Sequence, residues 1–260
     1  MKGIFMLAVL RKEKIKSILY NEKIVSVSTL ATQLHVTDET IRRDLSELED
    51  EGFLIRKHGG AILSHKVQTP SNDYDLKNVF VKNKQIIAEI AKTLIQPGDC
   101  IFLDASTTAY YIAKEISEMK LTVVTNSLSI INLLVPHKQI TLIVIGGTIQ
   151  TNRSSFNGHC AVNFLKNFYV DKAIISCRSL DMNAGITEAT EEFSELKKTA
   201  IKQANQTILA VDYSKFDKTS FIKTCDFSSI NDIITDKPLS SQWAEFLKSQ
   251  NVKLWIPKTQ

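Results

Sequence analysis

Beyond residue 98, short apolar runs alternate with longer amphipathic segments, and this alternation limits the folds open to the chain. Expected strands lie at 100–103, 121–124, 140–145, 173–175, 208–211, 233–234 and 252–255, and expected helices at 83–94, 107–116, 127–135, 161–168 and 191–205. Because most of the apolar runs contain no alternating polar residues, they predict strands buried on both faces of a parallel sheet. Strands separated by helices predict a doubly wound, Rossmann-like α/β domain.

Length and composition exclude several classes of protein. The chain has 260 residues, of which 43% are hydrophobic and 23% are charged, as in ordinary globular proteins. This much apolar surface excludes a largely disordered chain, and the length leaves room for two domains. No apolar run reaches the ~18–20 residues that a membrane-spanning helix needs, so we expect no membrane partner. The net charge of +4 is compatible with nucleic acid but does not by itself indicate it.

The cysteines and the first residues bear on where such a chain works. Cys100, Cys160, Cys177 and Cys225 have neither C-x-x-C nor metal-ligand spacing, which predicts reduced core thiols, no metal site and a cytoplasmic protein. The glycine motifs of nucleotide and dinucleotide sites are absent from the sequence, so we expect no cofactor. Residues 1–10 resemble a short signal sequence, but a charged run follows without a cleavage site. We interpret them as a leader into the first helix, with Met6 as an alternative start.

The N-terminal segment has the pattern of a helix-turn-helix. Ser28 is expected to cap one helix, His35 and Val36 form a tight break, and Thr37 is expected to cap the next helix. In that third helix of the segment an apolar stripe of Ile41, Leu45 and Leu48 leaves a polar, arginine-bearing outer face. A glycine-rich basic turn at 57–60 between apolar runs then predicts a hairpin, the wing of a winged helix.

This pattern predicts a DNA-binding face on the second helix of the motif and on the wing. The expected contact residues are Thr37, Glu39, Thr40, Arg42, Arg43, Ser46, Arg56, Lys57, His58 and Gly59. Two alternatives remain open at this point: a small helical subdomain with a solvated charged face, and a winged helix that binds protein. The adjacent arginines of the helix and the basic cluster of the wing favour DNA.

Small polar residues follow most of the expected strands. The carboxyl ends of parallel strands meet at one edge of a sheet, where ligands bind. A helix that begins with hydroxyl residues offers free N–H groups and a positive dipole end to an anion. The candidate ligand residues are Asp104, Ser106, Thr107, Thr108, Thr125, Asn126, Ser127, Gly146, Gly147, Arg153, Arg178, Asp181, Asp212 and Lys215. Each one alone is explained as a helix cap or strand end, but five such loops together favour a small phosphorylated polyol.

The run TLATQLHVTDETIRRDLSELEDEGFLIRKHGGAI at 29–62 closely resembles the N-terminal motif of the DeoR family of bacterial transcriptional regulators. The later blocks IFLDASTTAYYIAKEI, LTVVTNSLSIINLL, IVIGGTI and TILAVDYSKF resemble the family's C-terminal sensor domain. The resemblance implies a fold related to ribose-5-phosphate isomerase that binds a phosphorylated sugar, and it adds Thr187 to the candidate residues. Two departures from the family pattern, Ser106 in place of a glycine and SCRSLD at 176–181, lie in the expected pocket.

The sequence therefore predicts a two-domain protein with a winged helix-turn-helix at 1–63, a linker at 64–78 and an α/β sugar-phosphate sensor domain at 79–260. The expected function is sequence-specific transcriptional regulation. The chain would repress a carbohydrate-utilisation operon as a homo-oligomer, a dimer or tetramer, that binds double-stranded operator DNA and a phosphorylated sugar. The alternative is a sugar-phosphate isomerase that uses Glu188, Glu191, Glu192, Glu195 and Lys215. The acidic cluster is explained more simply as the solvated start of a helix, so we expect no enzyme.

Overall fold

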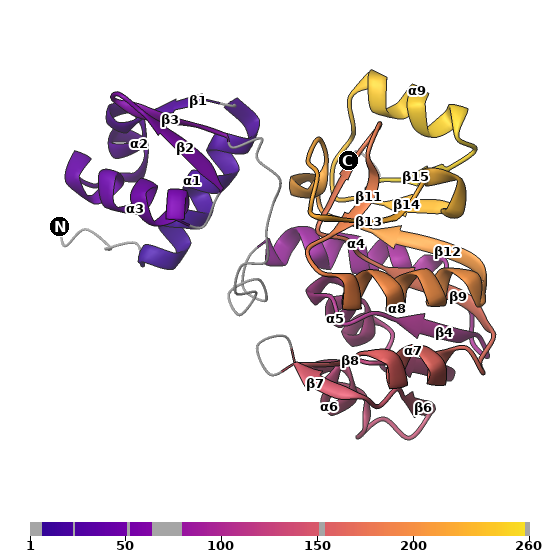
Figure 1. Ribbon diagram of the computed structural model, residues 1–260. Coiled ribbons are helices and arrows are strands. Elements are labelled where there is room, and N and C mark those ends of the chain that lie inside the picture. The colour runs from indigo at the N-terminus through magenta and orange to yellow at the C-terminus, as the bar shows by residue number, and fades with distance from the viewer. Residues whose placement is uncertain (1–6, 23, 51–52, 64–79, 151–153, 258–260) are drawn as a thin grey trace. The chain divides into compact units, whose positions relative to one another are not determined.

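The computed structural model describes residues 7–22, 24–50, 53–63, 80–150 and 154–257 (Figure 1). Contacts within the chain group Met1–Ser71 into one compact unit and Asn72–Gln260 into another. The expected linker at 64–78 and the candidate residue Arg153 lie outside the described residues. We describe the two units separately.

The N-terminal unit combines helices with a small antiparallel sheet. Its elements are α1 (Ala8–Glu22), β1 (Ile24–Ser26), α2 (Val27–Leu34), α3 (Asp38–Asp50), β2 (Leu54–Lys57) and β3 (Gly60–Leu63), and the sheet order is β1-β3-β2. The stripe of Ile41, Leu45 and Leu48 is buried, which confirms the predicted inner face of α3. His35 ends α2 in the left-handed conformation, with φ 53° and ψ 45°, and forms the tight break.

The expected cap of α2 was wrong by two residues. The Ser26 hydroxyl, not that of Ser28, accepts the hydrogen bond from the N–H of Thr29, at 3.1 Å. The backbone of Ser26 is still extended at the end of β1, with φ −101° and ψ 150°, so the helix begins immediately afterwards.

Two glycines are needed for the hairpin turn of the wing and for its packing against β1. Gly59 has φ +79°, a conformation that residues with a side chain rarely adopt, and its carbonyl accepts a 2.8 Å hydrogen bond from the N–H of Val27. Gly60 lies so close to β1 that a Cβ atom would be 2.0 Å from the carbonyl oxygen of Val25. Any side chain at Gly60 would therefore push β3 away from β1.

The C-terminal unit is built on a parallel sheet of seven strands, as the sequence predicted. In order across the sheet the strands are β15 (Lys253–Trp255), β14 (Asp232–Ile234), β12 (Ala204–Ala210), β9 (Val170–Ile175), β4 (Cys100–Leu103), β5 (Leu121–Thr125) and β6 (Ile140–Val144). Every neighbouring pair is parallel. The strand order changes direction between the neighbouring strands β9 and β4, and ligands of such sheets bind outside the carboxyl ends at this point.

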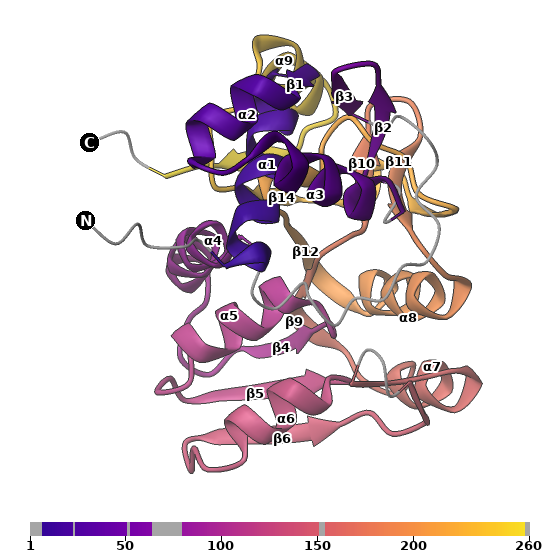
Figure 2. The same cartoon turned by 90° about the vertical axis from the view of Figure 1, so that its left-hand side faces the viewer.

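Helices cover both faces of this sheet. One layer consists of α4 (Val81–Thr93), α5 (Thr107–Glu115) and α6 (Leu128–Leu134), and the other of α7 (His159–Leu165), α8 (Glu191–Lys202) and α9 (Ser241–Ser249). Figure 2 shows α7 and α8 on the side of the strands opposite α4, α5 and α6. Several boundaries differ from expectation by two to four residues. Among the helices the largest shifts are in α7, which spans His159–Leu165 rather than 161–168, and at the end of α8, which stops at Lys202 because β12 already begins at Ala204.

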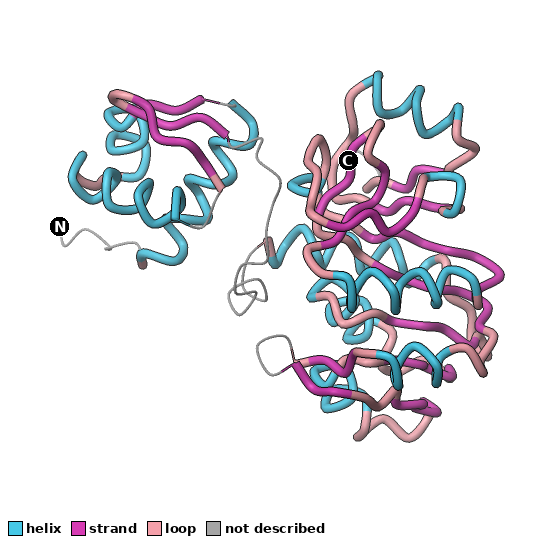
Figure 3. The backbone as a smooth tube through the Cα atoms, viewed as in Figure 1, coloured by secondary structure: helices cyan, strands magenta, loops and turns pink. Residues whose placement is uncertain are grey.

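Short antiparallel elements at the carboxyl edge were not predicted (Figure 3). They are the pair β7 (Thr148–Gln150) with β8 (Ser155–Asn157), and the sheet β10-β11-β13 of Ser179–Asp181, Gly185–Glu188 and Ile222–Cys225. Each strand has three or four residues and many polar side chains, so it leaves no clear hydrophobic pattern.

The prediction of core thiols was wrong for Cys160, which is exposed on α7, whereas Cys177 is buried.

Candidate functional site

The outer face of α3 carries exposed arginines. The side chains of Arg42 and Arg43 are 52% and 82% exposed. Arg42 lies 3.7 Å from Asp38 and 3.6 Å from Glu39, and Arg43 lies 3.3 Å from Glu47. Such exposed pairs within one helix are weak, so these guanidinium groups can exchange their partners for nucleic acid at little cost.

The other predicted DNA-contact residues of this helix lie at its start and along its accessible side. The Thr37 hydroxyl accepts a hydrogen bond from the N–H of Thr40 at 3.3 Å, which confirms Thr37 as the cap. The two hydroxyls lie 2.9 Å apart. Glu39 is exposed and Ser46 half-buried, so all the predicted residues of α3 lie on accessible positions.

Asp44, next to the two arginines in sequence, points the opposite way. It is 2% exposed, and its carboxylate receives the Arg11 guanidinium at 2.5 Å (Nε) and 3.0 Å (Nη2). The hydrogen bond to Asp44 raises the pKa of Arg11, and burial opposes that effect. A second pair joins the same helices, with Lys12 Nζ 3.0 Å from Glu47. Lys12, and to a smaller extent Arg43, lower the pKa of Glu47 against the opposing effect of burial. The position of α3 therefore depends on α1.

The wing holds its basic residues at the surface. Arg56, Lys57, His58 and Gly59 are all exposed. The N–H of Arg56 donates a 2.8 Å hydrogen bond to the Glu49 carboxylate, which joins β2 to α3. The wing and the outer face of α3 thus belong to one small unit.

At the carboxyl edge of the large sheet, Asp104 links two strand ends. Its Oδ1 accepts from the N–H of Ser106 at 3.0 Å, and its Oδ2 from the N–H of Ser176 at 2.9 Å. The Ser106 hydroxyl in turn caps α5 by accepting from the N–H of Ala109 at 3.1 Å. Thr107 at the start of α5 is half-buried, whereas Thr108 is only 3% exposed.

The loop after β5 is also brought to this edge, but its side chains face inward. Thr125 donates to the carbonyl of Leu103 at 2.7 Å and accepts from the N–H of Ser127 at 3.1 Å. Asn126 donates to the carbonyl of Phe156 at 2.9 Å, and Ser127 caps α6. All three are buried, so they hold the loop rather than face solvent.

Asp181, Thr187 and Asp212 likewise support local structure. Asp181 accepts from the N–H groups of residues 183 and 184, and Thr187 donates to the carbonyl of Ser179 at 3.0 Å. Asp212 accepts from the N–H of Ser214 at 3.0 Å. Burial would raise the pKa of Asp212, but Lys215, the Ser214 hydroxyl and Lys84 together lower it. This carboxylate therefore remains charged although it is buried.

Among the described candidates, the accessible ones form a smaller set. Ser106, Thr107, Arg178, Asp181 and Lys215 are half-buried, and Gly146 and Gly147 are exposed. Gly147 has φ +153°, and a Cβ there would lie 2.7 Å from the carbonyl of Asn157, so this turn needs glycine. These residues follow β4, β6, β9 and β12 and can face a ligand at the edge.

Two buried lysines escaped the sequence prediction. Lys197 of α8 contacts Glu188 and lies 3.2 Å from Asp104, and Lys84 of α4 is 3% exposed near Asp212. Each occupies a place in the buried stripe of its helix, where apolar residues are the rule, and this interruption is the signal that could have revealed them.

The start of α4 was also missed as part of this edge. The Asn83 amide donates a hydrogen bond to Asp236, which also accepts from the N–H of Tyr213 at 2.8 Å. Burial raises the pKa of Asp236, against the effect of these hydrogen bonds. The ring of Phe80 meets that of Tyr213 edge-on at 5.5 Å. The first turn of α4 is therefore bound to the loops that follow β12 and β14.

Comparison with known families accounts for both units. Residues 79–237 match the DeoR C terminal sensor domain, and residues 11–67 match the DeoR-like helix-turn-helix domain. The chain belongs to the DeoR family. It is thus a helix-turn-helix transcriptional regulator, and its helix-turn-helix domain implies DNA binding.

Several relatives resemble this DeoR-family chain over most of its length. YulB of Bacillus subtilis, an uncharacterized HTH-type transcriptional regulator, is 35% identical over 249 residues, 96% of each chain. The L-fucose operon activator of Haemophilus influenzae is 34% identical over 87% of this chain and 91% of its own. The transcriptional repressor GlcR of B. subtilis is 34% identical over 89% and 90%. Ribose 5-phosphate isomerase A of Methanocaldococcus jannaschii shows a distant structural likeness, with 18% identity and a TM-score of 0.40 over 54% of this chain and 56% of its own.

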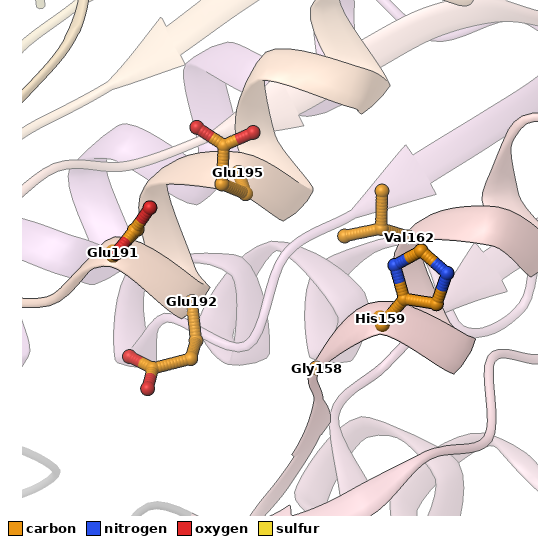
Figure 4. A pocket seen from close by; sticks show the side chains of 6 residues that line it. All are labelled: Gly158, His159, Val162, Glu191, Glu192 and Glu195. Atoms are coloured by element: carbon orange, nitrogen blue, oxygen red, sulfur yellow. The ribbon is translucent and has the colours of Figure 1, made fainter.

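A pocket of about 180 Å³ lies beside the starts of α7 and α8 (Figure 4). Glu191, Glu192 and Glu195 line it from α8, and His159 and Val162 from α7. Its carboxylates would repel a phosphate, so it does not suit the phosphate of the expected ligand.

Within the described parts of the chain, no cluster of side chains suits a metal ion, and no helix is long and apolar enough to cross a membrane.

Proposed function

We propose that this DeoR-family regulator represses a carbohydrate-utilisation operon and that a phosphorylated sugar, bound at the carboxyl edge of the large sheet, controls it. The observation that carries the proposal is the start of α5, where Ser106 caps the helix and Thr107 remains accessible. Free N–H groups at the start of a helix bind phosphate. Lys215 follows a nearby strand and adds positive charge.

The roles within the edge divide by burial. Ser106, Thr107, Gly146, Gly147, Arg178, Asp181 and Lys215 meet the ligand, and the start of the α5 helix at Thr108 offers its backbone. The buried side chains of Asp104, Thr125, Asn126, Ser127, Thr187 and Asp212 shape the site from below. Arg178 and Lys215 supply positive charge, and charge-assisted hydrogen bonds to a phosphate are stronger than neutral ones.

In the proposed complex with DNA, α3 enters the major groove and the wing contacts the backbone. Thr37, Glu39, Thr40, Arg42, Arg43 and Ser46 face bases and phosphates from α3, and Arg56, Lys57, His58 and Gly59 face phosphates from the wing. Repeated half-sites call for a homo-oligomer, in which residues 1–63 bind DNA and residues 79–260 bind the sugar.

The alternative, a sugar-phosphate isomerase, is not favoured. Its carboxylates Glu191, Glu192 and Glu195 are exposed in the first turns of α8, where acidic residues stabilise a helix. Glu188 is buried and already paired with Lys197. An aldose–ketose isomerase assay on the full chain is expected to show no turnover.

The test uses the full chain and a labelled duplex from upstream of its own gene. A thermal-shift panel of glucose 6-phosphate, fructose 1-phosphate, fructose 6-phosphate and ribose 5-phosphate, with the unphosphorylated sugars as controls, identifies a ligand. A ligand at ~100 Kd stabilises the protein by about 2.7 kcal/mol. Fluorescence anisotropy of the duplex then measures DNA affinity with and without it. Release of DNA on adding the sugar phosphate supports a repressor that the sugar inactivates. Tighter DNA binding would mean that the sugar strengthens DNA binding instead. If no sugar phosphate raises the melting temperature, the proposal is contradicted.

A further inference from the structure

The structure points to Lys197 as the residue that positions the phosphate-binding start of α5; we propose this role on the basis of the function proposed above. Lys197 lies on α8, on the opposite side of the sheet from α5. Its side chain is 8% exposed and reaches the carboxyl edge of the sheet from within.

The ammonium group of Lys197 has three polar partners, which come from three different segments. Nζ lies 3.2 Å from Asp104 Oδ2 after β4, donates at 2.7 Å to the carbonyl of Ser176 after β9, and contacts the Glu188 carboxylate at the end of β11. The Ser176 carbonyl and Glu188 accept hydrogen bonds from the ammonium group, and Asp104 forms an ion pair with it. The lysine therefore supports the ends of three strands and is not available to a ligand.

The contact with Asp104 is the one that reaches the ligand site. The same carboxylate accepts the N–H groups of Ser106 and Ser176, and Ser106 caps α5. Without the cation, Asp104 would lose the ion pair that holds its carboxylate beside Ser106, and it would in addition face the like charge of the buried Glu188. Asp104 would then turn away from Ser106, and the first N–H groups of α5 would lose the alignment that a phosphate requires.

The charge state of Lys197 is suited to this role. Burial lowers the pKa of its ammonium group, but Glu188 and Asp104 outweigh burial and raise it overall. The group is therefore positively charged at neutral pH. Because one cation faces two carboxylates, the cluster as a whole offers no surplus positive charge to an anion, which agrees with an indirect role.

The experiment compares Lys197→Met with Lys198→Met in the full chain. Lys198 is the next residue on α8, is half-buried and pairs with the exposed Glu195 of the same helix at 2.8 Å, so it is a matched control. A second variant, Lys197→Met with Glu188→Gln, removes the carboxylate repulsion and protects the fold. Melting temperature, operator affinity and ligand affinity are measured for each, with inorganic phosphate and with the sugar phosphate that most stabilises the wild type.

We expect the two Lys197 variants to bind operator DNA as the wild type does and to lose about 10–100-fold in affinity for the sugar phosphate, the size of loss seen when a residue that orients a metal ligand is removed. The affinity for inorganic phosphate should fall by the same factor, because α5 meets only the phosphate. Lys198→Met should match the wild type.

Three results would overturn the role of Lys197. Unchanged ligand affinity in a folded double variant would show that Lys197 serves stability alone. A loss for the sugar phosphate with unchanged inorganic phosphate affinity would place its effect at the sugar. If the wild type binds no sugar phosphate, the proposed function itself fails, and the role of Lys197 fails with it.

Discussion

Arg11 and Asp44 form a buried, two-point ion pair that fixes α3 against α1. Asp44 directly follows Arg42 and Arg43, which point to solvent. Successive residues on a helix point about 100° apart. Of these three consecutive charged residues, two therefore face solvent and one holds α3 against α1. Loss of DNA binding can then arise in two ways, through a missing contact or through a displaced helix, and the first two predictions separate them.

We expect Arg43→Ala to weaken operator binding by about 1–3 kcal/mol, the value of one lost base contact, while the melting temperature stays within error. Arg43 has only a weak partner in Glu47 on its own helix, so the fold does not depend on it. Fluorescence anisotropy at fixed salt measures the affinity. Operator affinity equal to that of the wild type would show that α3 does not read the DNA through this residue.

Asp44→Ala should instead destabilise the N-terminal unit, by about 3–5 kcal/mol, because it removes the buried carboxylate that the Arg11 guanidinium meets at two points. Thermal unfolding followed by circular dichroism should show an earlier transition. Asp38→Ala, which removes an exposed partner of Arg42 on the same helix, is the control and should change stability by less than about 1 kcal/mol. Equal stability of the two variants would mean that the buried pair contributes nothing.

For the wing, Lys57→Ala is expected to weaken specific and non-specific DNA alike. Lys57 is exposed beside the Gly59 turn and is expected to contact a phosphate, which carries no sequence information. The slope of log affinity against log salt concentration should fall by about 0.9, the value for one phosphate contact. A loss confined to the operator sequence, with the slope unchanged, would instead indicate base recognition by the wing.

At the sheet edge, Thr107→Asp should abolish binding of the sugar phosphate and leave operator binding intact. A carboxylate in the first turn of α5 is favourable to the helix, so the fold is preserved, but it repels a phosphate at the same position. Thr107→Asn, of similar size and without charge, serves as the control. A Thr107→Asp variant that responds to the ligand at wild-type concentrations would place the phosphate elsewhere.

The sequence predicted those elements whose pattern is local. The stripe of Ile41, Leu45 and Leu48 defined α3, and apolar runs defined the strands of the large sheet. Gly59 and Gly60 marked the wing because only glycine fits there. In each case, a few neighbouring residues contain the physical reason for the structure.

The sequence did not predict what depends on contacts between distant segments. Asp104 was predicted as a ligand residue, but its partner Lys197 is 93 positions away on a helix of the opposite layer. Asp44 was aligned with a family motif, yet its partner Arg11 could be identified only in three dimensions. The same holds for Asn83 and Asp236, which join α4 to the end of β14.

The division of the sheet edge into buried and accessible side chains has a consequence for how such regulators diversify. The buried residues form hydrogen bonds that hold the loops, so replacing them should lower the stability of the fold more than it alters ligand recognition. Thr107 begins α5, Arg178 and Asp181 follow β9, Lys215 follows β12, and all four are half-buried. Exchanging them among relatives would alter the chemical signal while the DNA-binding unit and the sheet stay the same, so that one architecture can serve many nutrients.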